Sequence, residues 1–345
     1  MDYKNLNTNV DWNNRIFWEV SGEHDELQNL FNIDVNRFID KSKVDIKNDV
    51  LIFKSYDVLT EISEEIFSLL ESGIKFIFNC LWEKESDHFD ILKPYVSNGI
   101  ALVSGTSYSI EGWPDNKLIF IPMSFWYIEF MRMNFIPDIS LNFKRNIRPH
   151  EFLMPVKRRR PHRELFVKLL GNNLHRGLYS IAWDNIVLPG QVSGDELNKY
   201  EWAWEEDRFY DPSWYRSTYY SVVVETSSTG SIFLTEKTFK PIMYGHPFII
   251  FGARHSLKTL RDFGFETFPE LFDESYDDEA NEVKRAEMIV NEISNFRLEK
   301  RYNENKHIID NKIQHNFNRF YNANFLLEAI NDNLAQKIGN FINGK

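Results

Sequence analysis

The sequence lacks the features that mark secreted and membrane-spanning proteins. Cys80 is the only cysteine in 345 residues, which excludes an intramolecular disulfide framework and predicts a reducing compartment. The N-terminal segment MDYKNLNTNVDWNNR contains no apolar stretch like that of a signal peptide. The most apolar run, Leu118 to Met131, is interrupted by Pro122 and Glu129 and is too short to span a bilayer. We therefore expect a soluble, cytoplasmic protein.

Common cofactor and metal motifs are also missing. The chain has no Walker A sequence, no Gly-x-Gly-x-x-Gly element and no Asp-x-Asp element. Its nine histidines show no paired spacing that would indicate a metal site. NTP hydrolysis, nicotinamide binding and metal dependence therefore lack their usual signals. We expect no metal and no bound cofactor.

The composition that remains is that of a globular protein with room for two domains. The net charge of −11 disfavours long-range attraction to nucleic acid or to an anionic membrane, although a local basic groove stays compatible with it. Aromatic residues reach 15%, with 29 Phe, 15 Tyr and 9 Trp. These side chains could fill large cores, or Trp and Tyr could line a carbohydrate or base platform.

Short apolar runs alternate with helical patterns in the first part of the chain. Strands are expected at residues 16–20, 50–53, 74–78, 100–103 and 118–121, and helical spacing between residues 58 and 70 ends at Gly73. This alternation is typical of a mostly parallel sheet with helices on both faces. We interpret residues 1–138 as a Rossmann-like domain.

The same pattern restarts after a polar stretch, Ile139 to His150, that is suited to a hinge. Strands are expected at residues 151–156, 178–182, 222–224 and 248–251. Residues 150–295 are therefore predicted to form a second Rossmann-like domain, followed by a helical segment at 296–345. The fold class is α/β, with two Rossmann-like domains facing a cleft, a favoured location for ligand sites.

The stretch from Ser221 to Gly252 places charged residues where such a sheet binds ligands. Glu225 follows the strand at 222–224, and Thr235 can cap a helix whose first turn holds Glu236 and Lys237. Helix N-termini at the carboxyl edge of a parallel sheet favour anions, and a lysine there adds a point charge suited to phosphate. A capped helix with surface charges would give the same pattern. Glu225 could bind a ligand's hydroxyl groups or be structural.

A second basic element follows the first strand of the second domain. The loop and helix start read KRRRPHR, and four consecutive cations in it would suit a diphosphate. The alternatives are a solvated basic turn or an RNA-contact patch. Because both basic elements should lie on one edge of one sheet, they are predicted to act together. The cations concerned are Lys157, Arg158, Arg159, Arg160 and Arg163.

Three ionisable residues after the strand at 74–78 are candidates for a general base. Glu83, Asp87 and His88 would face the cleft from the opposite domain, as a base that activates an acceptor hydroxyl must. Taken alone, each of them is more often an ordinary surface charge.

The segment FLTEKTFKPIMYGHPFIIFG resembles the donor-binding segment of GT-B glycosyltransferases. It is most similar to the family-10 fucosyltransferase type, in which a Thr-Glu-Lys turn precedes a helix, a Gly-x-Pro and an apolar strand. A longer pattern, with KRRRPHRELF upstream and DESYDD downstream, resembles glycosyltransferase-like proteins of tailed phages and marine bacteria. The resemblance covers about residues 150–295. Phe233 stands where fucosyltransferases usually have Tyr, and Thr238 and Phe239 follow the turn instead of Arg-Asn, so the donor base and sugar stay open.

The resemblance implies a role for each matched residue. Glu236 would hold the donor ribose and Lys237 the diphosphate, one of Arg158 to Arg160 would add a phosphate contact, and Glu225 would lie near the donor sugar. It further implies a hexosyl- or pentosyltransferase. The missing metal motifs and signal peptide predict that this enzyme is metal-independent and cytoplasmic, working in a bacterial or phage-infected cell. The donor would be a nucleotide-diphosphate sugar, the acceptor a glycan or small molecule, and the displacement inverting.

Two other functions remain compatible with the sequence. The chain could be a phage-type glycosyltransferase acting on hydroxymethylated bases of DNA, with Lys144, Arg145 and Arg148 joining KRRRPHR in a basic groove. It could also be a nucleotide-sugar-binding module without turnover.

Overall fold

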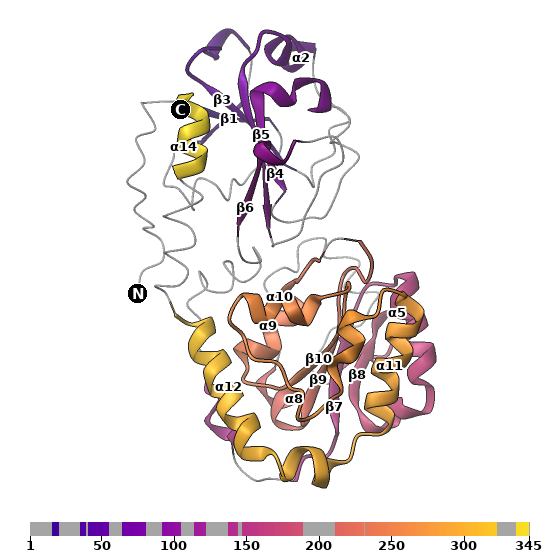
Figure 1. Cartoon of the computed structure of the whole chain (residues 1–345). Coiled ribbons are helices and arrows are strands. Elements are labelled where there is room, and N and C mark those ends of the chain that lie inside the picture. The colour runs from indigo at the N-terminus through magenta and orange to yellow at the C-terminus, as the bar shows by residue number, and fades with distance from the viewer. Residues whose placement is uncertain are drawn as a thin grey trace. The chain divides into compact units, whose positions relative to one another are not determined.

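The computed structural model describes residues 16–20, 35–38, 41–54, 64–80, 92–104, 114–121, 137–143, 147–188, 211–230, 232–322 and 336–344. The chain divides into two compact units (Figure 1). The N-terminal unit comprises Met1–Arg132 together with Asn322–Lys345, and the C-terminal unit comprises Met133–Tyr321. Each contains a parallel sheet and helices, so the predicted α/β class and its Rossmann-like alternation of strands and helices are confirmed.

The N-terminal unit has a six-stranded parallel sheet in the order β2-β1-β3-β4-β5-β6. The strands are β1 (Phe17–Glu19), β2 (Val35–Arg37), β3 (Val50–Lys54), β4 (Lys75–Cys80), β5 (Gly99–Ser104) and β6 (Leu118–Ile121). Its helices are α2 (Glu64–Glu71) and α14 (Gln336–Asn343). Short 3-10 turns occur at Lys41–Lys43, Lys93–Asn98 and Asp115–Lys117.

The core of this unit follows from strands that are apolar on both faces, as parallel strands usually are. Phe53 of β3 packs edge-on against Phe76 of β4, with ring centroids 5.7 Å apart, and α2 adds Leu69 and Leu70. The last helix is tied to the same sheet, because Lys75 Nζ donates hydrogen bonds to carbonyl oxygens near the end of α14.

The C-terminal unit has a four-stranded parallel sheet in the order β10-β9-β7-β8. The strands are β7 (Phe152–Val156), β8 (Leu178–Ile181), β9 (Tyr220–Val224) and β10 (Phe248–Phe251). The helices are α5 (Pro161–Leu170), α8 (Pro212–Arg216), α9 (Glu236–Met243), α10 (Ser256–Asp262), α11 (Glu282–Ser294) and α12 (Lys306–Phe320). Short 3-10 turns occur at Ser140–Phe143, Gly171–Arg176, Ala182–Asp184 and Glu274–Asp278, and a π-helical turn at Leu298–Asn303.

The strand order places a switch point between β7 and β9. From β7 the chain passes through α5 to β8 on one side, and it then returns to β9 on the other side of β7. Figure 1 shows α5 and α11 on one face of this sheet and α9 and α12 on the other. Phe166 of α5 stacks on Phe251 at 5.1 Å, while Phe239 of α9 packs near Phe320 of α12. Open α/β sheets bind ligands outside the carboxyl ends of the strands at such a point.

Sequence periodicity located most of these elements. Among the described strands the exception is β2, whose three residues VNR carry no run of apolar side chains, and the short helix α8 was not predicted either. Within the final residues 296–345, α12 packs on α9 of the C-terminal unit, whereas α14 belongs to the N-terminal unit. No helix among the described residues is long and apolar enough to cross a membrane.

Gly177 gives a test of the packing of the C-terminal sheet. A Cβ atom added there would lie 2.2 Å from the ring of Phe152 on the neighbouring strand β7. We expect Gly177→Ala to lower the free energy of unfolding by about 1–3 kcal/mol, because a buried ring must move. Chemical denaturation measures the change. Phe152→Leu in the same chain should recover part of the loss, and a Gly177→Ala variant as stable as the parent would contradict this packing.

Candidate functional site

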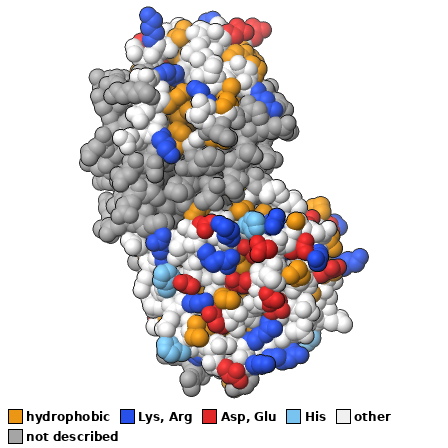
Figure 2. Space-filling model, in the orientation of Figure 1, with side chains coloured by type: hydrophobic (Ala, Val, Ile, Leu, Met, Phe, Trp, Pro, Cys, Tyr) orange, Lys and Arg blue, Asp and Glu red, His pale blue; other side chains and the backbone are white. Residues whose placement is uncertain are grey.

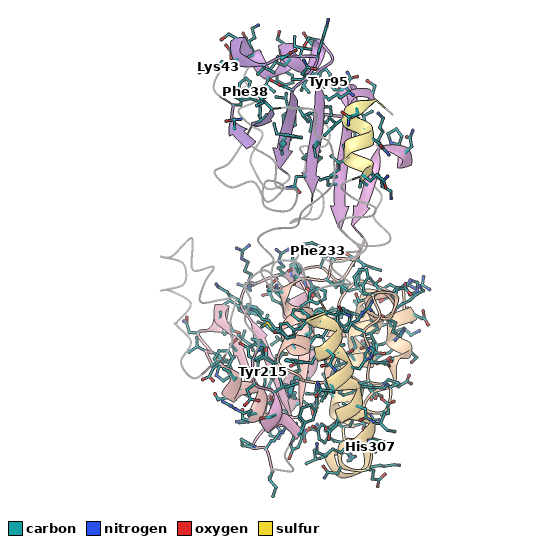
Figure 3. The ribbon with its side chains drawn as sticks, turned by 90° about the vertical axis from the view of Figure 1, so that its left-hand side faces the viewer. Phe38, Lys43, Tyr95, Tyr215, Phe233 and His307 are labelled. Carbon is teal, nitrogen blue, oxygen red and sulfur yellow. The ribbon has the colours of Figure 1, made fainter. Side chains whose placement is uncertain are left out.

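Three loops of the C-terminal unit meet at the carboxyl edge of its sheet. Residues 157–160 connect β7 to α5, residues 225–235 connect β9 to α9, and residues 252–255 connect β10 to α10. Figure 3 shows Phe233, from the second of these loops, at the opposite end of the unit from His307 of α12. The carboxyl edge therefore brings together both basic elements that the sequence singled out.

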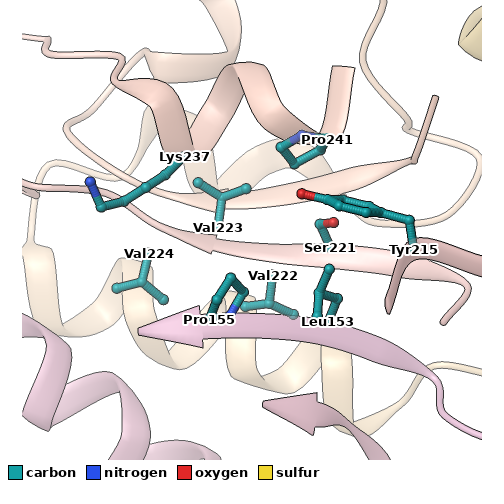
Figure 4. Close-up of a pocket in the computed structure, with 9 residues that line it drawn as sticks. All are labelled: Leu153, Pro155, Tyr215, Ser221, Val222, Val223, Val224, Lys237 and Pro241. Atoms are coloured by element: carbon teal, nitrogen blue, oxygen red, sulfur yellow. The ribbon is translucent and has the colours of Figure 1, made fainter. Parts of the chain in front are cut away.

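The start of α9 holds Lys237 among oxygen atoms. Thr235 is the N-cap, and its hydroxyl accepts from the Lys237 amide as well as from Lys237 Nζ at 3.3 Å. Lys237 Nζ also donates to Thr226 Oγ1 at 3.2 Å and forms an ion pair with Glu236. The two charged side chains stay 21% and 22% exposed. Figure 4 shows the ammonium reaching toward the carboxyl ends of the strands.

Glu236 is held in its charged form. Burial, the largest single effect, raises the pKa of this carboxyl, but the positive charges of Lys237 and Lys240 and the hydrogen bonding at the carboxylate together lower the pKa to about 2. Glu236 is therefore a carboxylate at neutral pH. Its exposed part can accept hydrogen bonds from hydroxyl groups of a ligand.

Glu225 occupies a different position from the one expected of a ligand contact. It is 0% exposed, and its carboxylate accepts four hydrogen bonds from the protein. Thr235 N and Thr238 Oγ1 donate to Oε1 at 2.9 and 2.7 Å. Thr226 N and Thr235 Oγ1 donate to Oε2 at 3.0 and 2.6 Å. The carboxylate thus binds the N-terminus of α9 and is closed off from a donor sugar.

The backbone carbonyl of Glu225 also accepts hydrogen bonds, from residues of α5 on the other face of the sheet. Its carbonyl oxygen accepts from Arg163 Nε and Nη2 at 3.3 and 3.1 Å and lies 3.0 Å from His162 Nε2. Arg163 is 2% exposed and also donates to the carbonyl of Arg158 at 3.0 Å. The predicted donor-binding role of Arg163 is therefore replaced by a structural one. It joins the basic loop to the end of β9.

The remaining cations of the basic loop differ in how they are engaged. Arg159 is paired with Glu164 at 2.5 Å, and Lys157 is half-buried. Arg158 is exposed and Arg160 half-buried, and neither guanidinium has a hydrogen bond or ion pair within the described residues. Arg160 is the residue that precedes α5, with Pro161 at the first helical position. Arg158 and Arg160 are therefore the cations of this loop best placed for a ligand anion.

Two arginines in or against the third loop were not predicted from the sequence. Arg254 is exposed beside the end of β10. Arg285 of α11 is 2% exposed and donates to the carbonyl oxygens of Gly252 at 3.1 Å, Glu279 at 2.6 Å and Ser228. It ties the third loop to the second. The position of Arg254 in the loop after an apolar strand was the available signal, whereas the role of Arg285 depends on tertiary contacts alone.

A small pocket lies beneath α9, between β7 and β9 (Figure 4). Its lining residues are Leu153, Pro155, Tyr215, Ser221, Val222, Val223, Val224, Lys237 and Pro241. About 20 Å³ of it can hold solvent, which suffices for a single water molecule and not for a nucleotide. A nucleotide would bind at the loops of the edge and not in this pocket.

Some expected residues fall outside the described part of the chain. The candidate bases Glu83, Asp87 and His88 are among them, as are Lys144 and Arg145. Arg148 is described, and it is buried, with its guanidinium donating to the carbonyl of Thr218 and packed over the ring of Tyr219. It therefore does not line a basic groove. Within the described ranges, no three His, Cys, Asp or Glu side chains form a group that could hold a metal ion.

The Gly-His-Pro element that follows α9 is structural. His246 lies 2.8 Å from Ser221 Oγ through Nδ1 and 2.8 Å from the Thr218 carbonyl through Nε2. Burial and the positive charge of Arg148 lower the pKa of His246 to about 3. The neutral ring thus donates to Thr218 and accepts from Ser221, at the amino end of β9 and away from the candidate site.

Comparison with known proteins adds no further assignment. No protein-family model matches the chain, and no curated protein matches its sequence.

The neutral state of His246 predicts a pH dependence of stability. The unfolded chain takes up a proton near pH 6.5, whereas the folded protein does so only near pH 3. The stabilisation is complete above pH 6.5 and is lost as the pH falls toward 3, by about 2 kcal/mol between pH 6.5 and about pH 5. Urea unfolding at several pH values should show that the free energy of unfolding falls less steeply with decreasing pH in His246→Gln than in the parent. His307→Gln on the surface of α12 is the control for losing a histidine, and equal slopes for parent and His246→Gln would refute the assignment.

Proposed function

We propose that this chain is a metal-independent glycosyltransferase of the GT-B type. In this proposal the C-terminal unit binds a nucleotide-diphosphate sugar, and the N-terminal unit supplies the acceptor site and the general base. The observation that carries the proposal is the pair of basic elements at one switch point. Arg158 and Arg160 follow β7, Lys237 starts the helix after β9, and these two strands are hydrogen-bonded neighbours.

The chemistry of this edge suits a diphosphate leaving group. Sugar transfer breaks the bond between the anomeric carbon and a phosphate oxygen, so negative charge accumulates on the departing diphosphate. Lysine and arginine side chains at the ends of β7 and β9 would stabilise that charge as it develops. The N-terminus of α5 has the same preference for anions, whereas that of α9 is already bound by Glu225 and the Thr235 hydroxyl.

Glu236 would bind the nucleoside part of the donor. It is a carboxylate at neutral pH and keeps part of its surface exposed beside Lys237. A carboxylate accepts hydrogen bonds from two neighbouring ribose hydroxyls, whereas Lys237 points its donors at phosphate. Glu236 and Lys237, which are adjacent at the start of α9, would thus bind the ribose and the diphosphate.

A base from the N-terminal half would complete the reaction. Glu83, Asp87 and His88 remain the candidates, since each could remove a proton from the acceptor hydroxyl as its oxygen attacks the anomeric carbon. A single displacement would invert the configuration at that carbon. The acceptor would be a glycan or a small molecule.

The distribution of charge favours such an acceptor over duplex DNA. Figure 2 shows basic and acidic side chains intermixed on the visible face of the C-terminal unit. Arg148, one of the cations that a DNA groove would need, is buried. A duplex gains most of its affinity from a continuous basic surface that neutralises phosphates.

A screen of nucleotide sugars tests the function directly. Thermal unfolding in the presence of each donor should show stabilisation by the cognate one, worth about 2.7 kcal/mol at a hundredfold excess over Kd. Release of the nucleoside diphosphate, with pools of acceptors, should then show turnover. Stabilisation without transfer or hydrolysis would identify a binding module, and the absence of stabilisation by any donor would contradict the proposal.

The role of Lys237 predicts a selective loss of affinity. Lys237→Ala should weaken binding of the nucleoside diphosphate by about 1.5–3 kcal/mol, the value of a charge-assisted hydrogen bond, and leave binding of the nucleoside nearly unchanged. Titration calorimetry measures both. Lys168→Ala, an exposed lysine in the last turn of α5, is the matched control for the loss of one positive charge. Equal weakening of both ligands would refute the phosphate assignment.

A further inference from the structure

Glu225 lies between the two basic elements and contacts both. Its side chain holds the N-terminus of α9, where Lys237 is located, and its carbonyl oxygen holds Arg163, which in turn binds the backbone of the basic loop. Both oxygens of the carboxylate accept a backbone N–H group, from Thr226 and from Thr235. The group therefore acts as an acceptor on each side.

An acceptor at this place determines the direction of the neighbouring hydroxyl. Thr235 has a single hydroxyl proton, and it donates that proton to Glu225 Oε2 at 2.6 Å. The lone pairs of Thr235 Oγ1 are then left to face Lys237, whose Nζ lies 3.3 Å away. The hydrogen bonds run in one direction, from Lys237 through Thr235 to Glu225.

The second neutral oxygen near the ammonium depends on the same carboxylate. Thr226 Oγ1 accepts from Lys237 Nζ at 3.2 Å, and the Thr226 amide donates to Glu225 Oε2. Thus Thr226 and Thr235, the two residues whose hydroxyls hold Lys237, are both fixed by Glu225. Among the described residues, the ion pair with Glu236 is the one contact that holds the ammonium independently of Glu225.

We propose that Glu225 is a positioning residue that aims the ammonium of Lys237 through the hydroxyls of Thr235 and Thr226. It touches no ligand itself, because it is fully buried. Its geometry is independent of the ligand, while the effect on diphosphate binding rests on the proposed function. The carbonyl of Glu225 also binds Arg163, which binds the basic loop. The same residue therefore fixes the positions of both the basic loop and Lys237.

The nearly isosteric Glu225→Gln separates positioning from packing. The amide nitrogen of Gln is a donor, so it cannot replace a carboxylate oxygen that accepts two hydrogen bonds. A Gln nitrogen in the place of Oε2 would donate to Thr235 Oγ1. The Thr235 hydroxyl would then reverse and turn its proton toward the ammonium of Lys237. We expect the ammonium to leave its present position in this variant.

Amine acylation of the ligand-free protein tests this step. Reaction with an N-hydroxysuccinimide ester, followed site by site by mass spectrometry, should be several-fold faster at Lys237 in Glu225→Gln and in Thr235→Val than in the parent, with Lys168 as the internal standard. Thr235→Ser should restore the parent rate. Thr238→Val is the matched control, since Thr238 donates to the same carboxylate at 2.7 Å but makes no hydrogen bond to Lys237 among the described residues. Equal rates at Lys237 in Thr235→Val and Thr238→Val would overturn the proposal.

A double-mutant cycle with inorganic pyrophosphate tests the consequence for binding. Glu225→Gln should weaken pyrophosphate binding on the order of tenfold in the parent and hardly at all in a Lys237→Ala background, because the effect passes through Lys237. Equal weakening in both backgrounds would indicate general damage and overturn the positioning role. If the parent protein binds no pyrophosphate, the proposed diphosphate site fails, and the acylation rates still decide the role of Glu225.

Discussion

The C-terminal unit depends on the set of hydrogen bonds that converge on the residue after β9. A carboxylate at this position is fully buried, and four donors from the start of α9 and its preceding loop surround it. Removing a carboxylate from water is costly unless hydrogen bonds replace the lost hydration. The start of α9 and its preceding loop supply these hydrogen bonds. The bonds that stabilise the buried carboxylate of Glu225 therefore also fix where α9 begins.

The same residue joins the two faces of the sheet. On one face lies α9 with Lys237, and on the other lies α5, whose Arg163 binds the carbonyl of Glu225. Loops are usually the most mobile parts of an α/β unit, yet the proposed diphosphate site would need its cations at set positions. Buried hydrogen bonds to backbone carbonyls provide this rigidity here. The loop cations Arg158 and Arg160, and part of the Lys237 side chain, remain accessible to an anion.

The charged residues of the edge thus form two groups, one buried and structural and the other exposed. Glu225, Arg163 and Arg285 are buried and link the three loops to one another. Exposed residues, including Arg158 and Arg254, face solvent, where a substrate would arrive. Residue type alone does not separate the groups, because arginine occurs in both. The sequence KRRRPHR likewise does not show which of its four arginines is buried.

The α/β class, nearly all the strands and the start of α9 were predictable from the sequence, because each depends on local periodicity or on a cap such as Thr235 within a few residues. It also placed Lys237 and the basic loop at the carboxyl edge, since parallel strands end together. Which charged side chains are buried and link the loops became clear from the folded structure and not from the sequence. Arg163 and Glu225 are 62 residues apart along the chain, and their contact exists because β7 and β9 are neighbours in the sheet. Burial and hydrogen-bond partners of this kind follow from folding, and no local pattern encodes them.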